Sequence, residues 1–325
     1  MPATAIAPRP RRDSIPAAPG RGPPAPGVVP HSGPVPAAAG IGLRFQHHRA
    51  VLETRPGVAW LEVHIENYMG GGTPLRHLDA IRRRYPLSLH GIGLSLGSAD
   101  GVDSDHLARV RTVIERFEPG LISEHLAWNI VDGTYLADLL PLPLTDEALD
   151  VVCRNVDRVQ AFLRRPILLE NPSSYLRFSH STIPEWDFIT AVAKRTGCGI
   201  LCDVNNIYVS AYNHGWDASA YLAALPAHGV GEIHLAGHTL RKIDDAHMIC
   251  IDDHGSRIAR AVWALYAEAL TRFGPVPTLI EWDTNVPPLC ALLAEAAQAA
   301  TMMKRYTSEA AASAVAPDAG HVATA

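Results

Sequence analysis

Histidines and carboxylates recur where short apolar runs of this 325-residue chain end. We count nine that could bind metal, four imidazoles and five carboxylates: His64, His90, Glu124, Glu170, Asp203, His234, Asp252, His254 and Glu281. Carboxylates that converge on one place repel one another unless cations neutralise them. Because one metal ion takes about four to six ligands, these nine predict two or three ions with a bridging carboxylate. The mixture of imidazole and carboxylate suits Fe, Mn or Zn better than Mg²⁺ or Ca²⁺.

Two Asp-x-His pairs compete for the same place in this set. Asp252 with His254 and Asp245 with His247 have the same spacing, which puts both side chains of an extended segment on one side. We favour Asp252 and His254, because a glycine and a helical pattern follow them at once.

Two neighbours of these residues receive other roles. We expect Asn206 to act in catalysis together with Asp252 and His254, and a turn cap at the end of a strand is the alternative for Asn206. His125 follows Glu124 in the chain, so side-chain alternation predicts that it faces the opposite way and supports the core or the ligands.

The elements that position these residues alternate between apolar runs and amphipathic stretches. Helical periodicity is clear over residues 105–117, 146–163, 186–196 and 256–273. Eight strands with helices between them predict a single (β/α)8 TIM barrel, whose strands end at the active-site rim. An open doubly wound sheet is the alternative. A dinucleotide-binding sheet of that kind would carry a G-x-G-x-x-G turn after its first strand, and the sequence has none there. The expected strands are residues 40–44, 60–68, 87–96, 121–128, 166–171, 199–208, 231–238 and 277–283.

Composition sets the frame around this barrel. Hydrophobic residues make up 47% of the chain and no apolar run approaches about 18 residues, which argues against a membrane span. A net charge of −5 offers no general attraction for nucleic acid. Eleven of the 26 prolines lie in the first 40 residues, so we expect a disordered extension over residues 1–39, a barrel over 40–303 and a disordered Ala-rich tail over 304–325. Five cysteines without a C-x-x-C pair fit the cytoplasm.

Several motifs together give a family resemblance. Over residues 40–303 the chain resembles the multinuclear non-haem iron-dependent oxidative enzymes, on a xylose-isomerase-like barrel. That family includes the iron subunit of methanobactin biosynthesis and enzymes that modify cysteines of ribosomally made peptides, and the branch acting on bufferin-like precursors is the most similar. The motifs are EVHIENY (62–68), LHGIGLSLG (89–97), SEHL (123–126), ENPSSY (170–175), DVNN (203–206), EIHLAGH (232–238) and LIEWD (279–283).

The resemblance implies a reaction and its participants. It implies two or three irons per chain, O₂ as co-substrate, a Cys-containing precursor peptide as substrate and a partner protein that recognises the peptide leader. The family resembles xylose-isomerase-like barrels and endonuclease IV in its metal site, and the nine positions match the ligand places of that broader site in order along the chain. One alternative is a zinc- or manganese-dependent hydrolase similar to endonuclease IV, or a sugar isomerase, on the same barrel. A nuclease would need a basic surface around its site, and the sequence has no Lys/Arg cluster beside the motifs. A non-catalytic metal- or peptide-binding module is the other alternative.

Overall fold

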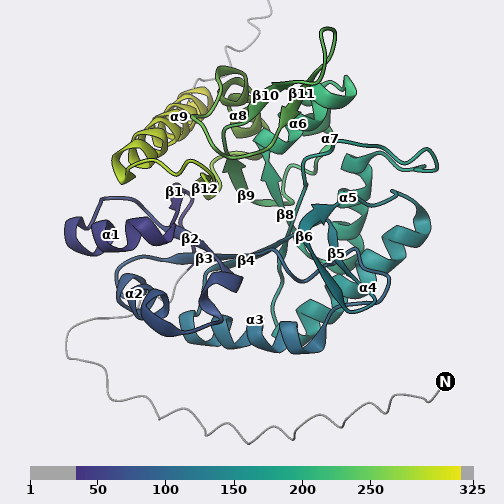
Figure 1. Ribbon diagram of the computed structural model, residues 1–325. Helices are drawn as coiled ribbons and strands as arrows, with labels where there is room; N and C mark the ends of the chain where they lie inside the picture. Colours follow the sequence, from purple (N-terminus) through teal and green to yellow (C-terminus); the bar gives the residue numbers. More distant parts are fainter. Residues whose placement is uncertain (1–33, 316–325) are drawn as a thin grey trace, which may run out of the picture.

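Eight parallel strands close into a barrel in the computed structural model, which describes residues 34–315 (Figure 1). The predicted barrel is therefore confirmed, and the open sheet is excluded. Parallel pairing puts all carboxyl ends at one rim, and the register sets His64 beside His90 and Asp203 beside His234. The strands, in order around the barrel, are β1 (Ala39–Gly42), β12 (Thr278–Ile280), β9 (Val230–Leu235), β8 (Gly199–Asp203), β7 (Leu168–Glu170), β4 (Leu121–His125), β3 (Leu87–Gly91) and β2 (Leu61–His64).

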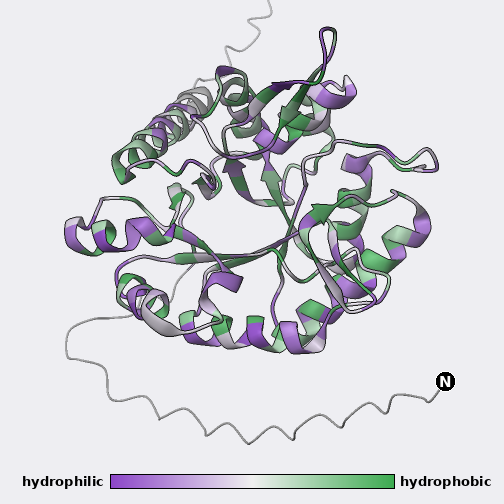
Figure 2. Cartoon of the chain, in the orientation of Figure 1, coloured by the Kyte–Doolittle hydropathy of each residue, from purple (hydrophilic) through white to green (hydrophobic). Residues whose placement is uncertain are grey.

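Amphipathic helices surround the strands. In α3 the buried residues are Leu107, Val110, Val113, Ile114 and Phe117, the spacing of one helix face. Figure 2 shows the resulting alternation of hydrophobic and hydrophilic patches along α3 and α4. The helices are α1 (His48–Thr54), α2 (Gly72–Arg82), α3 (Ser104–Phe117), α4 (Asp146–Leu163), α5 (Glu185–Thr196), α6 (Val204–His214), α7 (Ala218–Ala224), α8 (Arg260–Phe273) and α9 (Leu289–Val315).

Several strands end earlier than the apolar runs suggest. The run over residues 199–208 is strand only as far as Asp203, and α6 begins at Val204. The cause is local, because the Asp203 side chain accepts a hydrogen bond from the Asn206 backbone N–H and so caps the helix. Asn206 therefore lies in the first turn of α6. In the same way the chain after β2 forms a short 3₁₀ helix, Ile65–Tyr68.

Two β-hairpins that the sequence reading did not predict rise from the rim. The strands β5 (Trp128–Val131) and β6 (Thr134–Leu140) follow β4, and β10 (Thr239–Lys242) and β11 (Met248–Ile251) follow β9. The first hairpin turns at Asp132-Gly133, where both φ angles are positive (49° and 69°), as a tight two-residue turn requires. Both hairpins stand at the edge where the predicted ligands gather.

The two ends of the barrel domain differ from the expected boundaries. Helix α9 continues to Val315, so the tail expected from residue 304 begins as helix, with Met303 buried before it. At the other end Val35 is buried against Trp60 and Leu279, so the packed chain begins before residue 40. The rest of the expected extension (1–33) and tail (316–325) lies outside the described residues. None of the helices in the described range is long and apolar enough to cross a membrane.

Candidate metal centre

A cavity of about 330 Å³ opens at the carboxyl ends of the barrel strands. Buried polar side chains form its inner wall, and the hairpin strand β6 and the loop after β7 contribute to its rim. Asp203 and His234, which are fully buried, lie directly beneath. Its lining includes seven residues singled out from the sequence: His64, His90, Glu170, Asn206, Asp252, His254 and Glu281.

Three ligand atoms converge on one side of the cavity. His90 Nε2 and His125 Nε2 lie 3.3 Å apart, and each is 3.2 to 3.3 Å from Glu170 Oε2. The other nitrogen of His90, Nδ1, is 2.8 Å from Ser123 Oγ, which leaves Nε2 for a metal. His125 was expected to support the core or the ligands, but its own ring turns toward Glu170 at the end of β4 and offers a ligand atom to this group.

A second group lies at the centre of the barrel. Glu170, Asp203 and His234 offer ligand atoms within 4.8 Å of one another, and so do Asp203, His254 and Glu281. His234 Nδ1 is 3.0 Å from Glu281 Oε2 and 3.9 Å from Glu170 Oε1. Glu170 thus belongs both to the first group, with His90 and His125, and to this central group, with Asp203 and His234. This is the placement expected of a bridging carboxylate.

A third group lies against β1 and β12. His64, Glu281 and Asp283 have ligand atoms within 4.8 Å of one another. Arg44 binds Asp283 and lies 3.5 Å from Glu281 Oε1 and 3.4 Å from His64 Nε2. Its guanidinium is a cation that is ion-paired to this group, and it offsets part of the negative charge there. Asp283 was not predicted as a site residue.

The choice between the two Asp-x-His pairs follows from the structure. Asp252 and His254 line the cavity, and His254 Nε2 is 2.7 Å from Asp252 Oδ1. His254 has φ 44°, an unfavourable backbone conformation for a side chain with a Cβ, which holds its ring over the cavity. Asp245 and His247 lie in the exposed connection between β10 and β11, where His247 pairs with Asp244.

Glu124 is the one predicted ligand that the structure places neither in these groups of ligand atoms nor on the cavity wall, since Asp252, which is also outside the groups, lines the cavity. Its carboxylate is buried and accepts backbone hydrogen bonds from Leu94 (3.0 Å) and His125 (2.9 Å). Gly91 makes room for it, because a Cβ there would lie 2.8 Å from Glu124 Oε2. Glu124 thus holds the chain around His125.

Two more carboxylates lie below the cavity and were missed from the sequence. Glu62 and Glu232 are fully buried in the barrel interior, with Oε1 atoms 3.4 and 3.8 Å from His234 Nε2. Ser88 donates to Glu62 at 2.9 Å. The signal was present, because Glu62 precedes His64 and Glu232 precedes His234 by two residues, the spacing that shares a strand face.

Asn206 and Asp252 are held by further polar contacts. Asn206 Nδ2 donates to the Asn171 carbonyl, while its Oδ1 is buried without a hydrogen-bond partner. Asn205 Nδ2 donates to Asp252 Oδ1 at 2.8 Å, and Asn205 Oδ1 lies 2.8 Å from His238 Nδ1. These contacts fix the orientation of both predicted residues at the cavity wall.

Burial and crowding shift the ionisation of the cluster. Burial raises the pKa of Glu170 to about 8, and burial with the nearby Asp252 raises that of Asp203 to about 7. Burial and the neighbouring imidazoles of His125 and His234 hold the pKa of His90 well below its usual range, so His90 is neutral. So many acidic groups at one place would be stabilised by cations.

The donor atoms fit metal ions on a further observation. Asp203 Oδ2 is buried and has no hydrogen-bond partner, while the buried Glu170 Oε2 and His254 Nε2 lie against other candidate ligands, His90 and His125 in the first case and Asp252 in the second. Unpaired buried polar atoms are rare because each costs desolvation free energy. The separations of 3.2 to 3.3 Å around Glu170 Oε2 also match ligands of one ion at bond lengths of about 2.0–2.2 Å, which stand roughly 3.0–3.4 Å apart.

Comparisons with known proteins match most of the chain. A family model described as "RiPP precursor modification enzyme MbnB/TglH/ChrH" matches residues 38–304, where RiPP denotes a ribosomally made and post-translationally modified peptide. UPF0276 proteins are similar over most of their length. One from Vibrio vulnificus (strain YJ016) is 49% identical over 82% of this chain and 91% of its own. One from Acaryochloris marina is 48% identical over 82% of this chain and 95% of its own.

Solved structures share the fold at low identity. The 3-keto-D-glucoside 4-epimerase YcjR from E. coli superposes with a TM-score of 0.53 at 14% identity, covering 81% of this chain and 98% of its own. An L-ribulose 3-epimerase gives 0.52 at 12% identity, covering 88% and 99%. A xylose isomerase-like TIM barrel protein from Mycobacterium smegmatis gives 0.52 at 12% identity, covering 80% and 88%. These likenesses establish a xylose-isomerase-like barrel.

Proposed function

Because this chain belongs to the MbnB/TglH/ChrH family of RiPP precursor modification enzymes, we propose that it oxidises cysteine residues of a ribosomally made precursor peptide, with iron as its metal and O₂ as co-substrate. The observation that carries the proposal is the convergence of His90, His125 and Glu170 beside the central group of Glu170, Asp203 and His234. A shared carboxylate between two groups of ligands supports a centre with more than one metal ion.

Mixed imidazole and carboxylate donors are a set that suits iron. The residues that would hold it are His64, His90, His125, Glu170, Asp203, His234, Asp252, His254 and Glu281, with Asp283 beside them. Iron bound there would supply a Lewis-acidic and redox-active centre for oxidation of a cysteine by O₂.

The chain's own residues prepare this centre. Ser123 fixes the ring of His90, and Glu62 and Glu232 lie against the Nε2 side of His234, so each imidazole presents its other nitrogen to the cavity. Asn205 holds Asp252 in place. Arg44, held by Asp283, lies against Glu281 and His64 of the cavity wall and offsets part of the negative charge of the carboxylates there.

The rim supports a peptide as the substrate. Leu139 and Tyr175 line the cavity mouth and are 36% and 43% exposed. Exposed apolar side chains beside a polar site favour contact with another molecule that carries apolar groups. Leu240, Ile243 and Met248 on the second hairpin are also exposed, and they suit the leader-recognising partner that we propose.

All five cysteines are unpaired, which supports a reducing cytoplasm as the location that we propose for the protein.

The test is modification of the peptide itself. The chain is coexpressed with the short Cys-containing peptide and the partner encoded beside its gene, and the peptide mass is measured with and without O₂. We expect an O₂-dependent mass loss that disappears when Ser replaces Cys in the peptide and when Ala replaces His90 in the chain. A peptide of unchanged mass in the presence of iron, reductant, O₂ and partner would contradict the proposal, as would a zinc-only protein fully active on a phosphodiester.

A further inference from the structure

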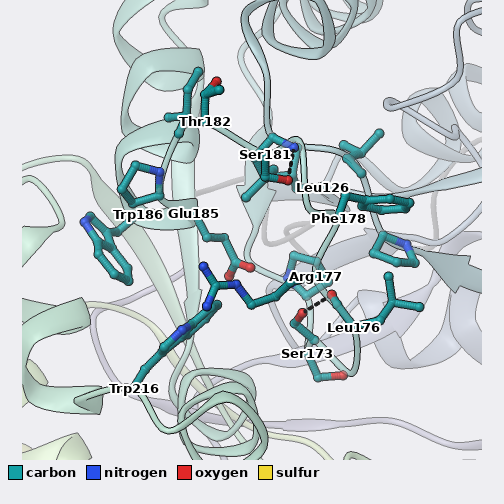
Figure 3. A pocket seen from close by; sticks show the side chains of 17 residues that line it. Leu126, Ser173, Leu176, Arg177, Phe178, Ser181, Thr182, Glu185, Trp186 and Trp216 are labelled. Carbon is teal, nitrogen blue, oxygen red and sulfur yellow. Dashed lines mark hydrogen bonds between the residues drawn. The ribbon is translucent and has the colours of Figure 1, made fainter.

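A second cavity (Figure 3) lies beside the cavity at the strand ends. Because candidate metal ligands line the latter, it is called the metal-lined cavity below. Its volume is about 240 Å³, and it shares Pro172 and Ser173 with the metal-lined cavity. Ser173 follows Glu170 by three residues, so the two lie at most about 11 Å apart along an extended chain. A group in the second cavity is therefore within reach of two or three extended peptide residues from a group bound at Glu170.

The walls of this cavity are largely apolar. Trp186 and Trp216 meet edge to face with ring centroids 5.9 Å apart, and Phe178, Leu126 and Leu142 complete the walls. Cavities of roughly 150 Å³ with such walls accept benzene. The space of about 240 Å³ thus suffices for one large apolar side chain.

The polar groups of the cavity tolerate an apolar occupant. Glu185 reaches into it from the start of α5 (Figure 3), is 8% exposed, and accepts a hydrogen bond from Tyr221 at 2.9 Å. Burial raises the pKa of Glu185 to about 7, so a good part of it is uncharged near neutrality. Arg177 lies over the Trp216 ring with its guanidinium carbon 5.7 Å from the centroid. Arg177 is exposed, so water reaches its side chain.

We propose that this cavity binds one large apolar side chain of the peptide substrate, about two or three residues from the cysteine that enters the metal-lined cavity. Pro172 and Ser173 line both cavities, and Tyr175 and Leu176, 43% and 50% exposed, follow them in the same loop. The identity of the occupant rests on the proposed function. Specificity for the sequence around the cysteine would then come from the loop between β7 and α5.

The test is the affinity of short capped peptides, measured by calorimetry on the full-length iron-loaded protein without O₂. In one pair of peptides Gly-Gly separates a Cys from a Phe, in either order. Matched peptides carry Gly for Phe or Ser for Cys. We expect the better Phe peptide to bind about tenfold or more tightly than its Gly match, the change expected for burying a large apolar side chain.

Two variants locate the effect. Thr182→Trp fills the cavity from an exposed lining position and should abolish the preference for Phe. Asp187→Trp, exposed on α5 outside the cavity, should keep it. Equal affinity of Phe and Gly peptides would overturn the proposal, as would a preference that survives in a folded Thr182→Trp variant with its iron retained.

The outcomes also separate this proposal from the proposed function. Binding that depends on Cys but not on Phe contradicts the second cavity alone. A preference for Phe that persists with Ser in place of Cys and is lost in Thr182→Trp, together with an unchanged mass of the precursor peptide when it is tested with O₂ and the partner, contradicts the proposed function and keeps the cavity as an apolar side-chain site.

Discussion

Glu124 and His125 are adjacent in the chain, yet their side chains make different contacts in the structure. His125 directs its ring to Glu170, while Glu124 accepts two backbone hydrogen bonds and holds the turn around β4. Strict alternation would put these side chains on opposite faces, but both residues lie at the very end of β4, where the strand conformation stops. Alternation is therefore a weak guide at the residues that matter for chemistry.

The pair gives a direct prediction. His125→Ala should lower the iron content by about one ion per chain, because an ion that loses one of its few protein ligands is held weakly. Glu124→Gln should keep the iron but lower the free energy of unfolding by about 1–2 kcal/mol, since one of two buried N–H groups loses its acceptor. Metal analysis and denaturant unfolding check both. Iron lost from Glu124→Gln and kept in His125→Ala would reverse the assignment.

The two Asp-x-His pairs give a matched comparison. His254→Ala should lose iron, because His254 offers a ligand atom to the central group together with Asp203 and Glu281. His247→Ala should keep all of it, because His247 lies in the exposed hairpin connection. Equal iron contents in the two variants, measured after anaerobic purification, would exclude His254 as a ligand.

At the residue scale the sequence could predict most of the candidate ligands, but not all of the buried side chains that surround them. His64, His90, Glu170, Asp203, His234, Asp252, His254 and Glu281 all came from their position at strand ends, and the structure brings them together. Glu62 and Glu232 were missed because residues inside a strand are expected to be apolar. Only the closed barrel reveals that their strand face points at His234.

At the scale of elements, Asp203 links the strand β8 to the helix α6. Its Oδ1 caps the helix, and its Oδ2 is buried and unpaired beside the central group. Asp203→Asn keeps an oxygen for the cap and removes the carboxylate, so it should lose iron with little change in stability. Asp203→Ala should lose iron and also about 1 kcal/mol of stability. Unfolding curves of the metal-free variants test the difference; equal stabilities would show that the cap contributes nothing.

Helices α5 and α7 meet through Glu185 and Tyr221, which gives a pH dependence. Burial raises the pKa of Glu185 from 4.5 to about 7, so the folded protein keeps a proton that the unfolded chain releases. Stability therefore falls as pH rises from the unfolded pKa through the folded one. Glu185→Gln, which keeps the acceptor for Tyr221, should remove this decline of about 2–3 kcal/mol between pH 5 and 8. Parallel stability curves for the two proteins would contradict it.

Some helices and strands could be predicted from the sequence and others could not. The periodic helices α3 and α4 were predicted within one residue of their ends. Helix α6 was missed because its apolar residues continue the run of β8 without a break, and a short apolar run does not separate a strand from a helix. The hairpins were missed although Asp132-Gly133 is a turn signal, because their strands are mostly exposed and form no long apolar run.

At the scale of the whole molecule, barrel closure creates the site. Arg44 on one side of the closure and Asp283 on the other are 239 residues apart in sequence, and they meet because β1 pairs with β12. The count of eight apolar runs predicted this closure, since all eight strands recur in the structure. Side-chain distances at the rim could not be predicted, because they depend on the register between neighbouring strands.

The central claim is that this rim holds more than one iron ion. Diffraction from anaerobically purified protein, recorded above and below the iron absorption edge, tests it most directly. We predict two or three iron peaks in the cavity, one of them beside His90, His125 and Glu170 and another beside Asp203, His234 and Glu281. No iron peak in the cavity, or a single ion that is zinc or magnesium, would contradict the account.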